Sequence, residues 1–209
     1  MSMSAVHFIV GETCNNGCRG CLWTRRLDFL PRIDLPIPED VRGRGVRLAG
    51  REPVMRKDLV EIVSSLRAAG ASSVEIETNG RTLPFAGVVQ SLRDAGATRL
   101  AIKLFATQEA AWEAHTRVPG SYAQTLRGIA VARRVAPRID LIAVLVPRRE
   151  PGASLRELVE FARELRFAQA RVELRLAKLD LAALPALAAE VRALRRQPPA
   201  GMRVDVAAA

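Results

Sequence analysis

Short apolar segments alternate with amphipathic segments along most of the chain, and this alternation limits the possible folds more than any other feature. The apolar segments have the length and composition of buried strands, while the intervening segments repeat apolar residues three and four positions apart, as one helix face requires. An example is 58–66, where the apolar residues at helical spacing are Leu59, Ile62, Val63 and Leu66. Strands that alternate with helices predict a parallel sheet covered by helices.

The predicted strands are 6–10, 46–49, 73–78, 99–105, 139–146 and 171–177. The predicted helices are 56–69, 84–95, 107–116, 121–135, 154–168 and 180–196. Gly70 and Gly96 stand where a glycine typically ends a helix, and Ser154 with Glu157 predicts a capping box. Six strand–helix units are too few for a closed eight-stranded barrel. We therefore predict an α/β fold, an open partial (βα)6 TIM-like barrel, with a flat doubly wound sheet as the alternative.

The whole chain, residues 1–209, is expected to form a single domain. Its parts are a loop with all the cysteines at 11–25, the barrel at about 6–178, and a C-terminal helix and tail at 179–209. No internal repeat or low-complexity linker divides the sequence, and a chain of this length can bury a sizeable core.

Several predicted strands alternate polar and apolar residues, whereas parallel strands buried on both faces are nearly continuous runs of Val, Ile and Leu. In 73–78, Val74 and Ile76 share one face, while Glu75 and Glu77 share the other. If the apolar faces pack against the helices, the polar faces point into the barrel. The side chains then expected inside are Arg47, Glu75, Glu77, Lys103, Glu173, Arg175 and His7.

Acids and bases that share a partly dry interior should pair with one another or with a ligand, because an unpaired buried charge is costly. The alternation therefore predicts a wet active-site trough instead of a packed barrel interior. The alternative is that these charges lie at strand ends and reach solvent at the rim of the sheet.

All three cysteines, Cys14, Cys18 and Cys21, lie within eight residues. Three thiolates in one loop suit an iron–sulfur cubane, because such a cluster normally takes four cysteines and a missing fourth leaves one iron open for chemistry. A structural zinc site would need a fourth ligand, and the two histidines, His7 and His115, do not belong to this loop. A disulfide would leave an odd cysteine and would have to join residues only three to seven positions apart.

The chain carries a formal charge of +10. Nucleic-acid binding is one interpretation of such a surplus, but one Tyr, two Trp and six Phe do not alternate with basic residues as stacking platforms require. A solvated basic surface is therefore favoured, and the charge favours an anionic substrate. The sequence lacks a run of eighteen uncharged apolar residues, and Met1–Ser4 shows no secretory signal, so we expect a cytoplasmic location and no membrane partner.

The spacing Cys-x3-Cys-x2-Cys, directly after the apolar segment 7–10, resembles the signature of the radical S-adenosylmethionine (radical SAM) enzymes. Two further segments follow in the order of that family's motifs. Gly50–Pro53 is similar to its Gly-Gly-Glu-Pro turn, and Glu77–Gly80 is similar to its Thr-Asn-Gly segment at the end of the next strand. The resemblance covers roughly residues 6–178.

The resemblance implies two cofactors: a 4Fe-4S cluster on Cys14, Cys18 and Cys21, and S-adenosyl-L-methionine (SAM) held by the fourth iron. It implies reductive cleavage of SAM to methionine and a 5′-deoxyadenosyl radical, which abstracts hydrogen from a substrate. Lys103 and Glu77 are the candidate catalytic residues, and Lys103 could pair with the SAM carboxylate, with a substrate anion, or with Glu75 or Glu77. The residues expected to contact the cofactors are Gly20, Gly50, Arg51, Glu52, Pro53, Thr78, Asn79, Lys103 and Arg175.

Two positions depart from the family's pattern. Arg51 stands where a second glycine is usual, and its backbone contacts survive a side chain only if φ stays negative. Gly20 stands where an aromatic residue normally precedes the third cysteine. These departures concern the backbone and the stacking contacts around SAM. They leave the cysteine signature of the family intact.

The expected partners are an electron donor such as flavodoxin or ferredoxin and a substrate that the sequence does not identify. Small metabolites, peptides and nucleotides all stay open, and the chain has no further cysteines that could hold an auxiliary cluster. Two alternatives remain: an activase that installs a radical on a partner protein, and a non-catalytic zinc or nucleic-acid-binding module.

Overall fold

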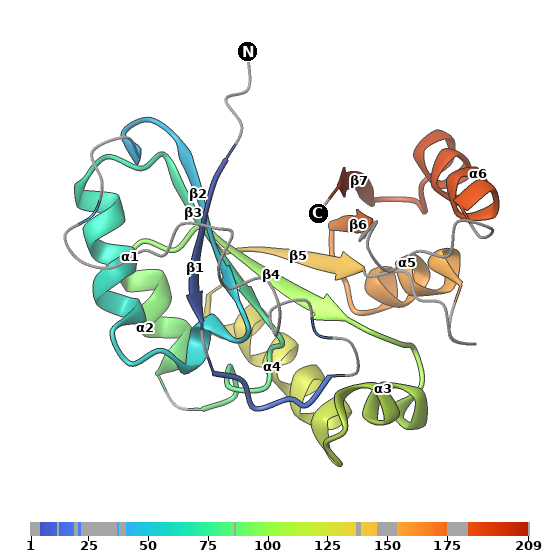
Figure 1. Ribbon diagram of the computed structural model, residues 1–209, viewed down its shortest axis with the longest axis horizontal. Coiled ribbons are helices and arrows are strands. Elements are labelled where there is room, and N and C mark those ends of the chain that lie inside the picture. Colours follow the sequence, from blue (N-terminus) through green and yellow to red (C-terminus); the bar gives the residue numbers. More distant parts are fainter. Residues whose placement is uncertain are drawn as a thin grey trace.

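One parallel sheet of seven strands organises the computed structural model, which describes residues 5–11, 13–18, 21, 37, 41–85, 87–136, 139–145, 154–174 and 184–208. The strands are β1 (Val6–Gly11), β2 (Gly45–Gly50), β3 (Ser73–Thr78), β4 (Arg99–Leu104), β5 (Asp140–Leu145), β6 (Gln169–Leu174) and β7 (Arg203–Ala208). They lie side by side in chain order, and each neighbouring pair is parallel (Figure 1).

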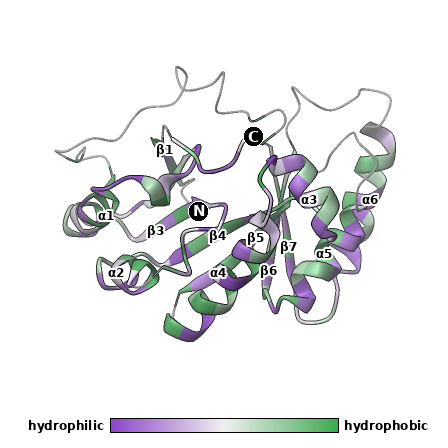
Figure 2. Ribbon diagram, turned by 90° about the horizontal axis from the view of Figure 1, so that it is seen from below, coloured by the Kyte–Doolittle hydropathy of each residue, from purple (hydrophilic) through white to green (hydrophobic). Residues whose placement is uncertain are grey.

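Six α-helices and one 3-10 turn are described in the segments that connect these strands. The helices are α1 (Leu59–Ala68), α2 (Val88–Asp94), α3 (Glu109–Thr116), α4 (Ser121–Val135), α5 (Leu155–Glu164) and α6 (Leu184–Arg196), and the 3-10 turn is η3 (Pro53–Met55). They lie along the outer side of the curved sheet (Figure 2). Within the residues that the structure describes, no helix combines the length and apolar character needed to cross a lipid bilayer.

The predicted fold class, a single α/β partial barrel, is confirmed, but the prediction of six strands is one too few. Residues 203–208, predicted as part of a tail, form β7, which pairs with β6. Val204 and Val206 are only partly buried, and their alternation with Arg203 and Asp205 is too short to distinguish an edge strand from a tail. In the described part of the chain β1 and β7 are the two edges of the sheet, so the barrel is open.

The two faces of the sheet have different chemistry, as the alternation predicted. Apolar strand residues such as Leu48, Ile76 and Ile102 belong to one large core with the helix residues Ile62 and Trp112. The opposite face has a separate apolar cluster made of Ala101, Ile142 and Val144. Burial against the helices therefore uses one face of each strand and leaves the other face for the barrel interior.

The predicted helix ends are confirmed where glycine or a capping box marks them. Gly70 and Gly96 have φ of 91° and 101°, the left-handed conformation that glycine adopts at little cost. At the start of α5, the Glu157 N–H donates to the Ser154 hydroxyl at 3.2 Å, and the Ser154 N–H donates to the Glu157 carboxylate at 2.6 Å. These local signals depend only on neighbouring residues, which is why the sequence could reveal them.

Helix α4 lies directly against the turn that follows β3. A Cβ added to Gly128 would come within 2.1 Å of the Gly80 carbonyl oxygen, so only glycine permits this approach. The Thr125 hydroxyl, nearly one turn earlier in α4, donates to the Asn79 carbonyl at 2.9 Å. Through these contacts α4 fixes the backbone of residues 79 and 80.

We predict that Gly128→Ala lowers the free energy of unfolding by about 1–3 kcal/mol, because the added methyl group overpacks the contact with Gly80. Helix propensity alone would act in the opposite direction by up to about 1 kcal/mol. Urea denaturation measures the change, and Ala130→Gly at an exposed position of α4 measures the propensity effect in the same helix. Stabilisation by Gly128→Ala would contradict the tight contact.

Candidate active site

The sequence motifs meet at the carboxyl ends of β1, β2 and β3. The register pairs His7 with Arg47 and Arg47 with Glu75, so the three strands end near one another. In parallel sheets ligands bind at this edge, because the loops after neighbouring strands converge there. The cysteine loop follows β1, Gly50–Pro53 closes β2, and residues 79 and 80 follow β3.

The end of β2 contacts the end of β1 through two glycines. Gly50 has φ of 137°, and a Cβ there would lie 2.6 Å from the Gly11 carbonyl oxygen. The Arg51 N–H donates to that same oxygen at 2.9 Å. Among the non-glycine residues that the structure describes, positive φ occurs at Arg117 and Arg166 and not at Arg51. The arginine therefore replaces the usual second glycine without backbone strain, and Gly50 is the residue whose conformation requires glycine.

Glu52 connects the β2 turn to the end of β3. Its carboxylate is buried and accepts hydrogen bonds from the Thr78 hydroxyl at 2.5 Å and the Asn79 N–H at 2.7 Å. It also accepts from the Val54 N–H at 3.4 Å at the start of η3. Burial raises the pKa of Glu52, and the hydrogen bonds from Thr78 and Asn79 oppose that rise. Glu52 thus fixes the end of β3 relative to the turn after β2.

Asn79 extends this connection to the cysteine loop. Its side-chain amide donates to the Asn15 side chain at 2.7 Å and lies 3.8 Å from the Cys14 sulfur. The Asn16 N–H donates to the same sulfur at 3.3 Å. On the other side, the Gly17 N–H donates to the Thr116 carbonyl at 2.8 Å, at the end of α3. The first half of the loop is therefore attached both to the sheet edge and to α3.

Arg81 is a further anchor of the loop that the sequence interpretation missed. Its guanidinium donates to the Asn15 carbonyl and, at 2.8 Å, to the Asn16 side chain. The same guanidinium donates to the Gln124 side chain of α4 at 2.7 Å. Arg81 therefore links the segment between the first two cysteines to α4. Its position directly after Asn79-Gly80 was the one sequence signal that could have suggested this role.

The three thiols form no disulfide and are partly buried. Burial raises the pKa of Cys14; the Asn16 N–H opposes this effect, and negative charge on Glu52 and Cys21 adds to it. Within the described residues, no three His, Cys, Asp or Glu side chains lie close enough together to hold a metal ion. Thiolates from one anchored loop are nevertheless the donors that iron–sulfur clusters take.

The barrel interior contains a continuous series of ion pairs. Glu75 pairs with Arg47 and Arg171, each at 2.7 Å. Glu77 pairs with Lys103 at 3.3 Å and with Arg171 at 3.6 Å. These acids are buried and come from β3, while their partners come from β2, β4 and β6. Each acid is therefore shared by two bases.

The structure brings together Arg47, Glu75, Glu77 and Lys103, four of the residues predicted to point inward. His7 is more exposed, on the edge strand β1, but its register with Arg47 places it on the same face of the sheet. Desolvation lowers its pKa, and the charges of Arg47, Glu77, Arg171 and Glu75 also act on it. Arg171 was missed, although it lies two residues before Glu173 and so on the same face of β6. The predicted site residues Gly20 and Arg175, and the side chain of Glu173, lie outside the described residues.

The predicted cofactor contacts around the sheet edge are also adjacent in the structure. Gly50, Arg51, Glu52 and Pro53 form the turn into η3, and Glu52 hydrogen bonds to Thr78 and Asn79. Lys103 lies in the interior on β4, where its charge is close enough to lower the pKa of Glu52 and of Cys14, partly opposing the larger effect of burial. The structure thus places these residues together, while their roles toward SAM stay predictions.

We predict that Arg81→Met loosens the cysteine loop without unfolding the protein. Loss of charge-assisted hydrogen bonds should lower the free energy of local opening by about 1.5–3 kcal/mol, so amide exchange at Asn15–Gly17 should accelerate more than tenfold. Hydrogen exchange of the protein before cluster loading measures this change, with Arg127→Met at an exposed site of α4 as the control. Unchanged exchange in Arg81→Met would show that the loop does not depend on this anchor.

Known proteins share both the sequence and the fold of this chain. The sequence model described as the radical SAM superfamily matches residues 8–165. The GTP 3′,8-cyclase of Marinobacter nauticus is 30% identical over 173 residues, which make up 78% of this chain and 51% of the cyclase. The chain therefore spans about half the length of this curated relative.

Solved structures show the same fold at low sequence identity. Streptococcus suis SuiB bound to S-adenosylmethionine has a TM-score of 0.67 and 16% identity, over 98% of this chain and 47% of SuiB. The protein anSMEcpe, with bound AdoMet and a Kp18Cys peptide, has a TM-score of 0.69 and 10% identity, over 97% of this chain and 64% of anSMEcpe. With the family match over residues 8–165, these similarities establish that the chain belongs to the radical SAM superfamily.

Proposed function

We propose that this chain holds a 4Fe-4S cluster on Cys14, Cys18 and Cys21, binds SAM beside it, and uses SAM cleavage to act on a nucleotide. The observation that carries this proposal is the hydrogen-bonded connection from Cys14 through Asn79 to Glu52. It joins all three family motifs at one edge of the sheet. When bound, the cluster supplies one electron for the reductive cleavage of SAM to methionine and a 5′-deoxyadenosyl radical.

The residues of the chain position the reactants. Asn79 and Arg81 hold the cysteine loop against the sheet. The turn Gly50–Pro53, fixed by Glu52, presents backbone groups to the SAM amino group, as the family resemblance implies. Lys103 provides a cation for the SAM carboxylate or for a substrate anion, and in their absence Glu77 neutralises it.

The proposed substrate class rests on the sequence relatives and on the charge of the interior. The relatives at 30% identity are named for a reaction of GTP, whereas the proteins with peptides in their structures share only 10–16% identity. In the described part of the interior, Arg47, Lys103 and Arg171 face two acids, Glu75 and Glu77. The surplus positive charge favours an anionic substrate such as a purine nucleoside triphosphate.

An anaerobic assay tests this proposal directly. The reconstituted protein is mixed with dithionite and SAM, with and without GTP, and 5′-deoxyadenosine is measured by chromatography. We expect 5′-deoxyadenosine to form and its rate of formation to rise with GTP.

Cys14→Ala, Cys18→Ala and Cys21→Ala should each lose cluster absorbance and SAM cleavage, because each removes one of three ligands. Full cluster occupancy in any variant would refute the ligand assignment, and indifference to GTP would refute the substrate class.

We predict that Lys103→Met weakens binding of SAM or GTP about tenfold, as expected for the loss of one charge-assisted contact. The fold should suffer less, because Glu77 retains Arg171 as a partner. Calorimetric titration and urea denaturation of the same protein separate the two effects. Arg99→Met, which removes a charge from the more exposed start of the same strand, is the control. A loss of unfolding free energy of about 3–5 kcal/mol with unchanged affinities would make Lys103 only a structural partner of Glu77.

A further inference from the structure

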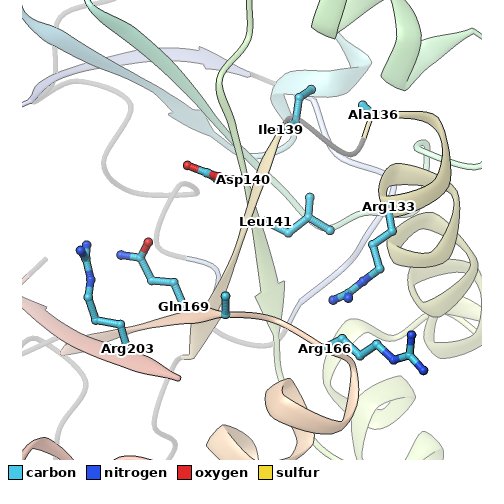
Figure 3. Close-up of a pocket in the computed structure, with 9 residues that line it drawn as sticks. Arg133, Ala136, Ile139, Asp140, Leu141, Arg166, Gln169 and Arg203 are labelled. Atoms are coloured by element: carbon cyan, nitrogen blue, oxygen red, sulfur yellow. The ribbon is translucent and has the colours of Figure 1, made fainter. Parts of the chain in front are cut away.

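A pocket of about 540 Å3 lies at the opposite edge of the sheet from the candidate active site, at the amino ends of β5, β6 and β7 (Figure 3). Asp140, Gln169 and Arg203 are the first residues of those strands. The remaining lining residues are Arg133, Ala136, Ile139, Leu141, Arg166 and Ala168. Three arginines and a single acid therefore line this pocket, which has no part in the proposed reaction.

Two of the arginines lack an acidic partner. In the described part of the chain neither Arg133 nor Arg166 forms an ion pair. The Arg133 guanidinium lies 5.4 Å from the centre of the Phe167 ring, and its Nη2 is shielded from solvent without a hydrogen-bond partner among the described residues. A buried N–H group without an acceptor is costly, so this donor points to a missing acceptor.

Arg133 and Arg166 lie on the same side of the pocket in Figure 3. Burial lowers the pKa of Arg133, and the positive charge of Arg166 lowers it further. Two cations without acidic partners on one side of a pocket repel each other, and an oxyanion bound by both would convert that repulsion into attraction. The guanidinium group has the planar fork of donors that matches phosphate oxygens.

Arg166 follows the last residues of α5, at the position where a helix commonly ends in a left-handed residue. Its φ is 61°, a left-handed conformation that favours glycine and is uncommon for other residues. The turn between α5 and β6 holds this conformation with a hydrogen bond from the Arg166 N–H to the Arg163 carbonyl at 2.8 Å. The Phe167 N–H also donates to the Ala162 carbonyl at 2.9 Å, which is the bonding pattern of an ordinary helix end. The end of α5 therefore accounts for this conformation, and it places Arg166 beside the pocket.

The polar groups on the other side of the pocket already have partners. Gln169 and Arg203 both bind Asp205, at 2.6 Å and 3.0 Å. Asp140 is exposed and lies 3.7 Å from Arg99. The position for an anion is therefore beside Arg133 and Arg166, away from both of these carboxylates.

We propose that this pocket binds a phosphate group, with Arg133 and Arg166 as its two ligands. Free pyrophosphate and the phosphates of a nucleotide present the same chemistry to these two arginines, and titration distinguishes the two sources. This site is separate from the cysteine loop and does not depend on the proposed function.

Titration of the purified chain before cluster loading tests the proposal. Pyrophosphate binding is measured by calorimetry at constant ionic strength for wild type, Arg166→Gln, Arg166→Lys and the control Arg163→Gln. Both Arg163 and Arg166 are exposed, so these variants remove the same charge from neighbouring positions. We expect about tenfold weaker binding in Arg166→Gln, partial recovery in Arg166→Lys, and no change in Arg163→Gln. Equal affinity in Arg166→Gln and Arg163→Gln would overturn the proposal.

Two further titrations identify the source of the phosphate. If Arg166→Gln weakens pyrophosphate and GTP equally, the phosphate group alone is recognised; a larger loss for GTP identifies a nucleotide. Citrate serves as a carboxylate probe, and citrate binding as tight as that of pyrophosphate would overturn the assignment to phosphate. The double variant Arg133→Gln with Arg166→Gln should abolish binding, and circular dichroism verifies that it is folded.

Discussion

A carboxylate removed from water must have its oxygens hydrogen-bonded, and the way in which Glu52 meets this requirement determines the site around it. Its partners are the Thr78 hydroxyl and the Asn79 N–H, so the turn after β2 cannot move independently of the end of β3. The Asn79 side chain then contacts Asn15 and Cys14. The position of the cysteine loop therefore depends on a buried acid in the turn that follows a different strand.

One face of the sheet provides the hydrophobic core, and the other carries the charged residues of the barrel interior. Residues such as Leu48, Ile76 and Ile102 pack with the helices and provide the hydrophobic free energy of folding. Among the described residues, the opposite face has a small apolar cluster of Ala101, Ile142 and Val144, and its charged residues pair with one another. Because the helix face already supplies a large core, the interior can carry polar groups that a closed, packed barrel would exclude.

The sequence was informative where the signal is local and periodic. Alternation in residues 73–78 placed Glu75 and Glu77 inside, and the order of the cysteines, Gly50–Pro53 and Thr78-Asn79 indicated the family and the edge of the sheet. The sequence's only signal for Arg81 was the position directly after Asn79-Gly80, because the contacts with the cysteine loop join residues 65 or more positions apart. The sequence suggested that Arg51 would distort the turn after β2, yet the positive φ belongs to Gly50 and not to Arg51.

The sharing of Glu75 and Glu77 between three bases has a consequence for how the interior admits a ligand. Arg171 contacts both acids, while Arg47 and Lys103 each contact one. If an arriving anion pairs with Lys103, Arg171 still neutralises Glu77. If the anion pairs with Arg47, Arg171 still neutralises Glu75. When a ligand binds, one base leaves its acid for the ligand, and Arg171 remains as the partner of that acid. No acid is then left as an isolated charge, so little reorganisation energy opposes binding.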